Sequence, residues 1–188
     1  MKIGILGGTF NPIHLGHLIL AEEAREKLGL QKIVFVPTYL APHKKNSHVA
    51  SAKARYAMIK LAIRGNKHFS VSDTEIKRKG VSYTIETIRE FRKSFPKKEL
   101  YFITGSDLLR YLKDWKDLKE ILRIVKFVVA TRPGYPLEEI PSYISTVAIR
   151  AVDVSAFEVR NCVKTNKSFR YLVPDAVYKF IKKHNLYK

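Results

Sequence analysis

The chain has 188 residues, of which 46% are hydrophobic, so it can bury a core without disulfides or structural metals, and we expect one domain spanning residues 1–188. Its one cysteine, Cys162, excludes an internal disulfide and any multi-cysteine metal site. The 35 Lys and Arg residues against 17 Asp and Glu give a net charge of +18, which attracts polyanions. Because the basic residues are scattered along the sequence, this charge favours a solvated lysine-rich surface over a dedicated nucleic-acid site.

The first predicted elements form a strand–helix–strand unit. Residues 3–6 are an apolar, β-branched run that indicates a buried strand. A glycine-rich turn follows, and apolar residues then recur at helical spacing as far as Gly29. Residues 33–36 are a second buried strand, closed by Pro37. Such a unit predicts a right-handed crossover and a parallel sheet.

The middle of the chain continues this alternation of helices and strands. In order, we expect a polar loop over 38–51, a helix through 54–62, a short strand at 69–71, an irregular segment at 73–80, a helix after 82–84, a strand at 100–103, helical patterns at 108–112 and 115–124, and a strand at 125–130.

The C-terminal part is predicted to hold a last strand and two helices. The strand covers residues 146–152, Ser155 and Glu158 have the spacing of a helix capping box, and the final helix follows Pro174. Together these elements predict an α/β fold: a Rossmann-like open parallel sheet of about five strands with helices on both faces, plus a C-terminal helical segment.

The turn after the first strand carries the strongest chemical signal. Residues 7–17 read Gly-Gly-Thr-Phe-Asn-Pro-Ile-His-Leu-Gly-His. The glycines allow a tight bend and close approach of a ligand, and the helix start that follows is a favourable place for phosphate. His14 and His17 lie on one side of the first helical turn. The turn is therefore predicted to offer backbone donors and two imidazoles to one anionic ligand.

Other polar segments fall at the carboxyl ends of predicted strands, where open parallel sheets bind ligands. They are residues 37–45, Gly105 with Asp107, and Arg132. The chain has no GxGxxG, GxxxxGK[ST], GxSxG or HExxH motif, which disfavours a dehydrogenase, a P-loop NTPase, a serine hydrolase and a zinc protease. Imidazole, Lys and Arg side chains instead suit transfer of phosphate groups, with Mg²⁺ held mainly by the substrate's own phosphates and water and no side-chain metal site.

The motifs together resemble those of the nucleotidyltransferase superfamily, whose signature is HxGH, and within it those of the bacterial nicotinate-nucleotide adenylyltransferases. The resemblance covers nearly the whole chain, because five motifs occur in one order. They are residues 7–17, Pro42-His43-Lys44, Ser82-Tyr83-Thr84, Gly105-Ser106-Asp107 with Trp115, and Arg132-Pro133-Gly134.

The resemblance implies transfer of AMP from ATP to nicotinate mononucleotide, a step of NAD biosynthesis that gives deamido-NAD and pyrophosphate with the help of Mg²⁺. It also implies a role for each matching residue. The catalytic set would be His14, His17, Lys44 and Arg160; the ATP-binding set Gly8, Thr9, Phe10, Gly105, Asp107 and Ser155; and the mononucleotide-binding set His43, Tyr83, Thr84, Trp115 and Arg132.

Two motifs depart from the family pattern. The late family motif ISSTxIR is here Val-Ser-Ala-Phe-Glu-Val-Arg over residues 154–160, so Ala156 and Phe157 bring no hydroxyl. We expect ATP binding to survive through the helix N-terminus with a changed set of contacts. Asn11 stands where many relatives have Asp, which removes a charge.

Alternative interpretations remain open at this point. Another HxGH enzyme, such as a phosphopantetheine adenylyltransferase or a cytidylyltransferase, would keep the reaction class and change the acceptor. A basic nucleic-acid-binding module is disfavoured by the absence of recognition motifs. No segment has the pattern of a signal peptide or the length of a membrane span, so we expect a cytoplasmic enzyme, compatible with a homo-oligomer, without a membrane or specific nucleic-acid partner.

Overall fold

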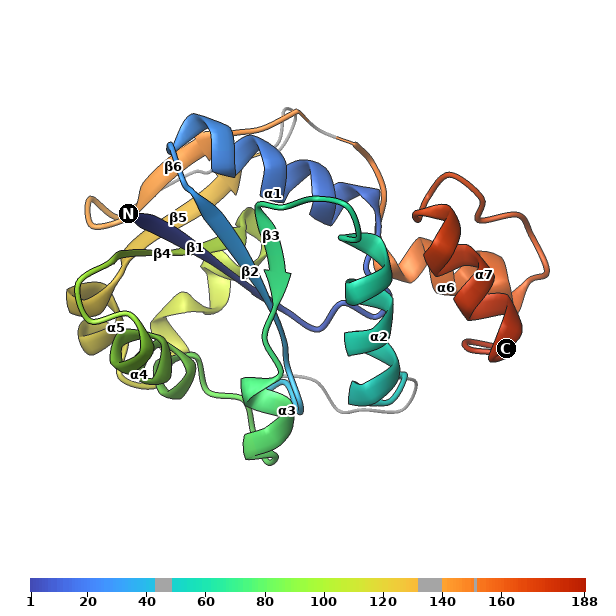
Figure 1. Cartoon of the computed structure of the whole chain (residues 1–188), viewed down its shortest axis with the longest axis horizontal. Coiled ribbons are helices and arrows are strands. Elements are labelled where there is room, and N and C mark those ends of the chain that lie inside the picture. The colour runs from blue at the N-terminus through green and yellow to red at the C-terminus, as the bar shows by residue number, and fades with distance from the viewer. Residues whose placement is uncertain (43–48, 132–139, 151) are drawn as a thin grey trace.

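A parallel sheet of six strands forms the centre of the computed structural model (Figure 1). The structure describes residues 1–42, 49–131, 140–150 and 152–188, without the side chains of residues 107, 108 and 110. The strands are β1 (Lys2–Gly8), β2 (Lys32–Pro37), β3 (Phe69–Val71), β4 (Glu99–Gly105), β5 (Lys126–Thr131) and β6 (Ser145–Ala148). Their order is β3-β2-β1-β4-β5-β6. The predicted Rossmann-like sheet is confirmed, with six strands where about five were expected, because β6 pairs with β5.

Helices cover both faces of this sheet, as the sequence predicted. One face carries α1 (Leu15–Lys27), α2 (Ala52–Ala62), α6 (Ala156–Lys164) and α7 (Asp175–Lys183), and the other carries α4 (Thr84–Ser94), the 3₁₀ helix η1 (Ser106–Asp114) and α5 (Leu118–Ile124). Strand side chains alternate between the two cores: Ile33 and Phe35 of β2 pack with α1 and α2, whereas Val34 and Val36 pack with α4 and α5. Figure 1 shows α1 and α4 on opposite sides of the strands.

A short helix, α3 (Thr74–Arg78), lies where the sequence suggested irregular chain. Its side chains are fixed by distant partners and not by local helical propensity. Glu75 is buried and accepts a 2.5 Å hydrogen bond from the Thr87 hydroxyl, and Arg78 pairs with Glu86 and Glu90 of α4. Burial raises the pKa of Glu75. Tertiary contacts therefore override a polar local sequence at this position.

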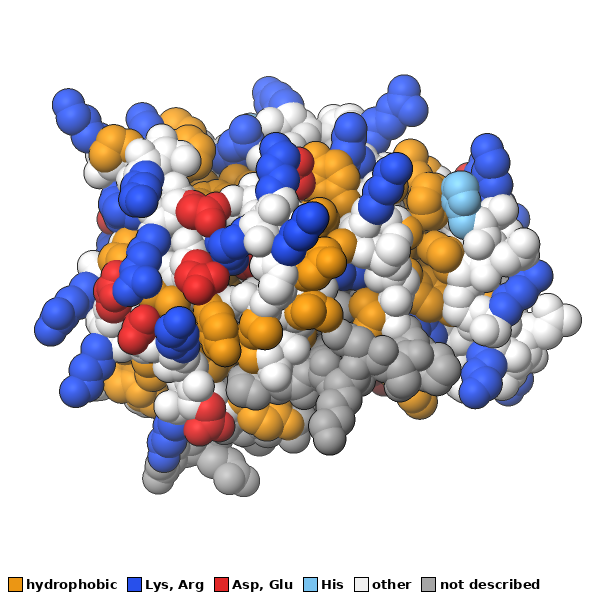
Figure 2. All heavy atoms as spheres, turned by 90° about the horizontal axis from the view of Figure 1, so that it is seen from below, with side chains coloured by type: hydrophobic (Ala, Val, Ile, Leu, Met, Phe, Trp, Pro, Cys, Tyr) orange, Lys and Arg blue, Asp and Glu red, His pale blue; other side chains and the backbone are white. Residues whose placement is uncertain are grey.

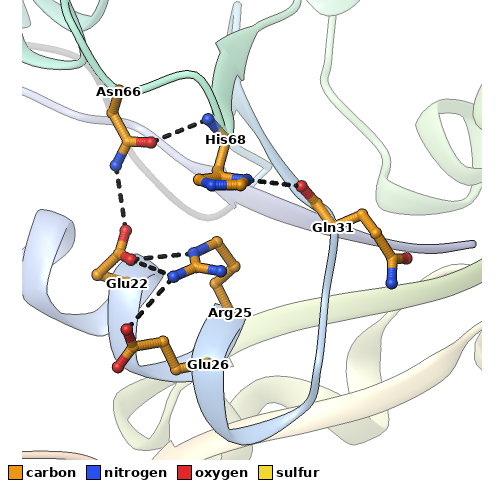
Figure 3. Close-up of polar contacts among 6 residues, drawn as sticks. All are labelled: Glu22, Arg25, Glu26, Gln31, Asn66 and His68. Carbon is orange, nitrogen blue, oxygen red and sulfur yellow. Dashed lines mark hydrogen bonds and ion pairs between the residues drawn. The ribbon is translucent and has the colours of Figure 1, made fainter.

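Polar contacts fasten α1 to the chain that precedes β2 and β3 (Figure 3). Glu22 accepts hydrogen bonds from Arg25 and from the Asn66 amide, 3.1 Å away, and the Asn66 side chain accepts from the His68 backbone N–H. The His68 ring lies 3.2 Å from the Gln31 carbonyl oxygen. The hydrogen bond from Arg25 lowers the pKa of Glu22, so the network is charged at neutral pH.

A second anchor joins α1 to the chain after β6. The buried carboxylate of Glu23 accepts hydrogen bonds from the Arg150 side chain and from the Arg150 N–H, 2.9 Å away. These bonds lower the pKa of Glu23 to about 2. The stability that they contribute is present above the ordinary carboxyl pKa and is lost as the pH falls towards about 2.

The surface shows no single basic patch on the face in Figure 2, where Lys and Arg side chains are interspersed with acidic ones and with apolar areas. Among the described residues, no helix has the length and apolar character needed to cross a membrane.

The order of the strands defines where a ligand is expected. β1 lies in the middle, with β2 on one side and β4 on the other, and the chain order reverses between β1 and β4. In open α/β sheets, ligands bind beyond the carboxyl ends of the strands at such a switch point. Here those ends are Gly8 and Gly105, which belong to two of the predicted motifs.

Candidate active site

The opening turn folds back over the end of β1. Phe10 has a left-handed backbone (φ 48°), and its ring is buried, 5.8 Å from the ring of Phe35. A Cβ on Gly8 would lie 3.1 Å from Cζ of Phe10, so the glycine gives this ring its space. Because the ring belongs to the core, Phe10 has only its backbone groups to offer a ligand.

The two histidines of the HxGH motif lie ring against ring at the start of α1. His14 is the residue before the helix and is buried, whereas His17 is half-buried, and their ring centroids are 3.7 Å apart. The His14 backbone N–H donates to Nδ1 of His17 at 3.3 Å. In its neutral form, His17 therefore carries its proton on Nε2, the nitrogen on the opposite side of the ring.

Gly16 explains the small residue between these histidines. A Cβ at this position would lie 3.1 Å from Nδ1 of His14 and 3.4 Å from the carbonyl oxygen of Val154. The glycine therefore lets the His14 ring lie against the helix and lets the segment before α6 approach it. The first and last motifs of the chain meet at this position.

The start of α1 offers fewer backbone donors than a helix N-terminus usually does. The N–H of Leu15 donates to the carbonyl oxygen of Leu172 at 3.0 Å, and the N–H of His17 donates to the carbonyl oxygen of His14. An anion at this turn would therefore depend more on the imidazoles and the turn itself than on the helix end.

The second segment predicted to bind ATP lies at the end of the neighbouring strand. Gly105 ends β4 and precedes η1, and Asp107 is the second residue of η1. Because β1 and β4 are adjacent, the structure brings Gly105 to the same edge of the sheet as Gly8. The side chain of Asp107 lies outside the described part of the structure.

The aromatic residues assigned to the mononucleotide belong to the core on the α4 and α5 face. Trp115 is half-buried and packs edge-to-face on Phe102 and Phe127, at 5.7 and 5.6 Å between ring centroids. Tyr83 precedes α4, which begins at Thr84, and both are half-buried. The Lys116 ammonium lies 4.6 Å from the centroid of the Tyr83 ring. Trp115 and Tyr83 thus pack at the edge of one apolar cluster.

The late motif reaches the opening turn through its arginine. Ser155 caps α6, as predicted, by accepting a 3.1 Å hydrogen bond from the Glu158 N–H, which leaves its hydroxyl proton able to donate. Arg160 donates from Nη1 to the carbonyl oxygen of Asn11 at 2.7 Å. Ala156 is half-buried, and Phe157 is 70% exposed.

One residue that organises the site was missed from the sequence. Arg55 is 1% exposed, and its guanidinium donates to the carbonyl oxygens of Thr9, Ala50 and Tyr39 at 2.7, 3.0 and 3.3 Å. Burial lowers its pKa from the ordinary value. A signal was present, because Arg55 shares helical spacing with the apolar Met58 and Ile59, so it lies on the core face of α2.

Three predicted site residues lie outside the described part of the structure: His43, Lys44 and Arg132. The chain on either side of the first two is described, and Arg55 binds the carbonyl groups of Tyr39 before them and Ala50 after them.

Comparison with known proteins defines the class first. A family model described as cytidylyltransferase-like matches residues 5–161. The match contains the opening turn, the end of β4 and the late arginine. The chain therefore belongs to the cytidylyltransferase-like family.

Full-length relatives narrow this class. A probable nicotinate-nucleotide adenylyltransferase of Thermus thermophilus is 45% identical, with 100% of both chains covered. One from Desulfitobacterium hafniense is 41% identical over 100% of this chain and 96% of the relative. Within its family, the chain belongs with the nicotinate-nucleotide adenylyltransferases.

Solved structures support the fold. The Plasmodium falciparum nicotinic acid mononucleotide adenylyltransferase complexed with NaAD superposes with a TM-score of 0.81 at 18% identity, covering 99% of this chain and 97% of the other. The same enzyme complexed with APC gives 0.80 at 19% identity, with coverage of 99% and 96%.

Proposed function

We propose that this enzyme transfers AMP from ATP to nicotinate mononucleotide. A phosphate oxygen of the mononucleotide attacks the α-phosphorus of ATP, the bond from that phosphorus to the bridging oxygen breaks, and pyrophosphate leaves as deamido-NAD forms. The observation that carries the proposal is the close ring pair of His14 and His17, held beside the end of β1 where the strand order reverses. Charge stabilisation at such a centre needs no protein nucleophile.

On the ATP side, His17 donates through Nε2 to a phosphate oxygen, and His14 supports it by ring contact and by its backbone N–H. The turn contributes backbone groups, and Arg160 adds positive charge next to Asn11. The remaining proposed ATP ligands are Gly8, Thr9, Phe10, Gly105, Asp107 and Ser155, with Lys44 as a further catalytic cation.

On the mononucleotide side, Trp115 stacks on the pyridine ring and Tyr83 and Thr84 hold the ring and its carboxylate. All three residues are half-buried, Trp115 and Tyr83 at the edge of one cluster, which leaves each side chain partly accessible to a ligand. His43 and Arg132 are proposed to meet the mononucleotide phosphate.

The proposal includes Mg²⁺ brought by the ATP phosphates. The donors at the described turn are imidazole, guanidinium and backbone groups, and the part of the chain that the structure describes has no cluster of three His, Cys, Asp or Glu side chains able to hold a metal ion. This donor set fits a triphosphate that carries its own Mg²⁺, an ion that prefers oxygen ligands. When bound, the ion neutralises charge on the phosphates.

We also propose that the whole chain folds as one domain. The apolar core on the α1 face joins residues from Leu6 to Ile181, and α2 packs against α7. The C-terminal helices thereby share a core with the strands that carry the site.

Release of pyrophosphate from MgATP tests this function. The acceptors to compare are nicotinate mononucleotide, nicotinamide mononucleotide, phosphopantetheine and none. We expect release with nicotinate mononucleotide to exceed that with every other acceptor. Release with phosphopantetheine alone would assign a different acceptor, and equal release with no acceptor at all would contradict the proposed function.

Lys116→Ala should weaken the preference for the acid over the amide mononucleotide. The ammonium over the Tyr83 ring places a positive charge beside the residue assigned to the nicotinate carboxylate. Because Lys116 is exposed, water screens this charge, and we expect the ratio of the two kcat/KM values to fall about threefold.

The matched control for this prediction is Lys113→Ala, an exposed lysine of η1. It should leave the ratio as in the wild type. If Lys116→Ala and the control have the same ratio of kcat/KM values for the two mononucleotides, Lys116 has no role in the choice of acceptor.

A further inference from the structure

Asn11 is a point where separate parts of the chain meet the opening turn. Its side-chain oxygen, Oδ1, accepts a 3.0 Å hydrogen bond from the N–H of Ala50 and a 2.9 Å bond from the hydroxyl of Tyr187. Its backbone carbonyl accepts from Arg160. With only 6% of its surface exposed, Asn11 has little contact with water, so these bonds hold it in a defined place.

Tyr187 lies 176 residues from Asn11 along the sequence, in the chain after α7. Its backbone is left-handed (φ 68°) and its side chain is half-buried. Burial raises the pKa of the phenol, opposed in part by the positive charges of Arg160 and Arg55. The hydroxyl therefore keeps its proton at physiological pH and remains a donor to Asn11.

The same contacts connect Asn11 to Arg55. Ala50 donates its N–H to Asn11 and accepts from Arg55, and Arg55 also binds the carbonyl of Thr9 in the opening turn. The turn is thus held from the start of α2 and from the chain after α7. Tyr187 supplies the hydroxyl for the second of these connections.

We propose that Tyr187 is a positioning residue for AMP transfer. It fixes the Asn11 side chain and thereby the backbone between the glycine turn and His14, without touching either substrate. This inference rests on the proposed function, because AMP transfer is its readout. Loss of the hydroxyl removes the bond that ties Oδ1 to the chain after α7, so the turn can tilt, and small misplacements of catalytic groups cost rate.

Tyr187→Phe tests the proposal, because it removes the hydroxyl and keeps the ring. We expect kcat to fall about tenfold, while KM for the mononucleotide stays within about twofold, because the change is confined to the ATP side. The matched control is Tyr178→Phe in α7, whose ring packs on Phe169 at 4.6 Å, and its kinetic constants should equal those of the wild type.

A merely structural role would lower the thermal midpoint of Tyr187→Phe and leave kcat per folded molecule unchanged, which would overturn the proposal.

A second measurement uses Asn11→Ala. If Tyr187 acts through Asn11, adding Tyr187→Phe to Asn11→Ala should cost less than about twofold more in kcat, whereas multiplied losses would show independent action. If the wild-type enzyme does not transfer AMP, the proposed function is refuted. If the wild type transfers AMP and Tyr187→Phe does so at the same rate, only the role of Tyr187 is refuted.

Discussion

His17→Ala is expected to lower kcat for AMP transfer about 10²–10³-fold, the range measured when one donor to transition-state charge is removed. The His14 N–H fixes Nδ1 of His17, so the ring presents its Nε2 proton in one orientation. That donor is in place before charge develops on the phosphates, and alanine removes it entirely. The loss should appear in kcat and in kcat/KM for both substrates.

The fold should survive this change. His17 is half-buried, and its ring contacts include His14 and Phe10, the latter at 5.0 Å between centroids. An aromatic pair contributes about 0.5–1.5 kcal/mol beyond burial, which is a fraction of the stability of a domain. Steady-state pyrophosphate release and the thermal midpoint are the two measurements. His184→Ala, an exposed histidine after α7, is the control: it should match the wild type in turnover, and like His17→Ala it loses a ring contact, here with Phe180 at 4.3 Å between centroids. Unchanged turnover by His17→Ala would show that the opening turn is not the reacting centre.

Arg55→Met is expected to lower the free energy of unfolding by about 3 kcal/mol. The substitution leaves the carbonyl groups of Thr9, Tyr39 and Ala50 without their guanidinium donor, and a buried acceptor that loses its partner costs about 1–3 kcal/mol. The substitution also removes the free-energy cost of burying a cation, which offsets part of this loss. The expected loss of stability is therefore near the lower end of the total for three carbonyl groups.

Urea denaturation measures this loss. The stability of Arg55→Lys should lie between those of the wild type and Arg55→Met. The lysine ammonium cannot reach all three carbonyl groups that the planar guanidinium of Arg55 binds. Lys53→Met, an exposed position of the same helix, is the control and should change stability by less than about 0.5 kcal/mol. An Arg55→Met protein as stable as this control would contradict the role assigned to the guanidinium.

Much of the fold was predictable because its signals are local. The apolar β-branched or aromatic runs of β1, β2, β4 and β5 are each followed in the sequence by glycine or proline, and Ser155 has the cap spacing of a helix start. The opening turn was predictable for the same reason, since strand, glycines and histidines are contiguous. Its place at the switch point follows from parallel topology alone.

The rest depends on contacts between distant parts of the chain. α3 forms because Glu75 and Arg78 have partners on α4. The sequence of residues 73–80 by itself does not indicate these partners. The hydrogen bond from Tyr187 to Asn11 has no sequence signature, so Asn11 could be interpreted only as the loss of a charge. The structure shows that an oxygen acceptor is what this position uses, which both Asn and Asp provide.

The most direct test follows the label from ATP into product. The wild-type enzyme is given nicotinate mononucleotide with ATP radiolabelled at the α-phosphorus or, separately, at the γ-phosphorus, and the products are separated. We predict that the α-label enters the dinucleotide and the γ-label enters pyrophosphate. A γ-label transferred to the mononucleotide, or an α-label that remains in ATP, would contradict attack at the α-phosphorus and with it the function assigned to the opening turn.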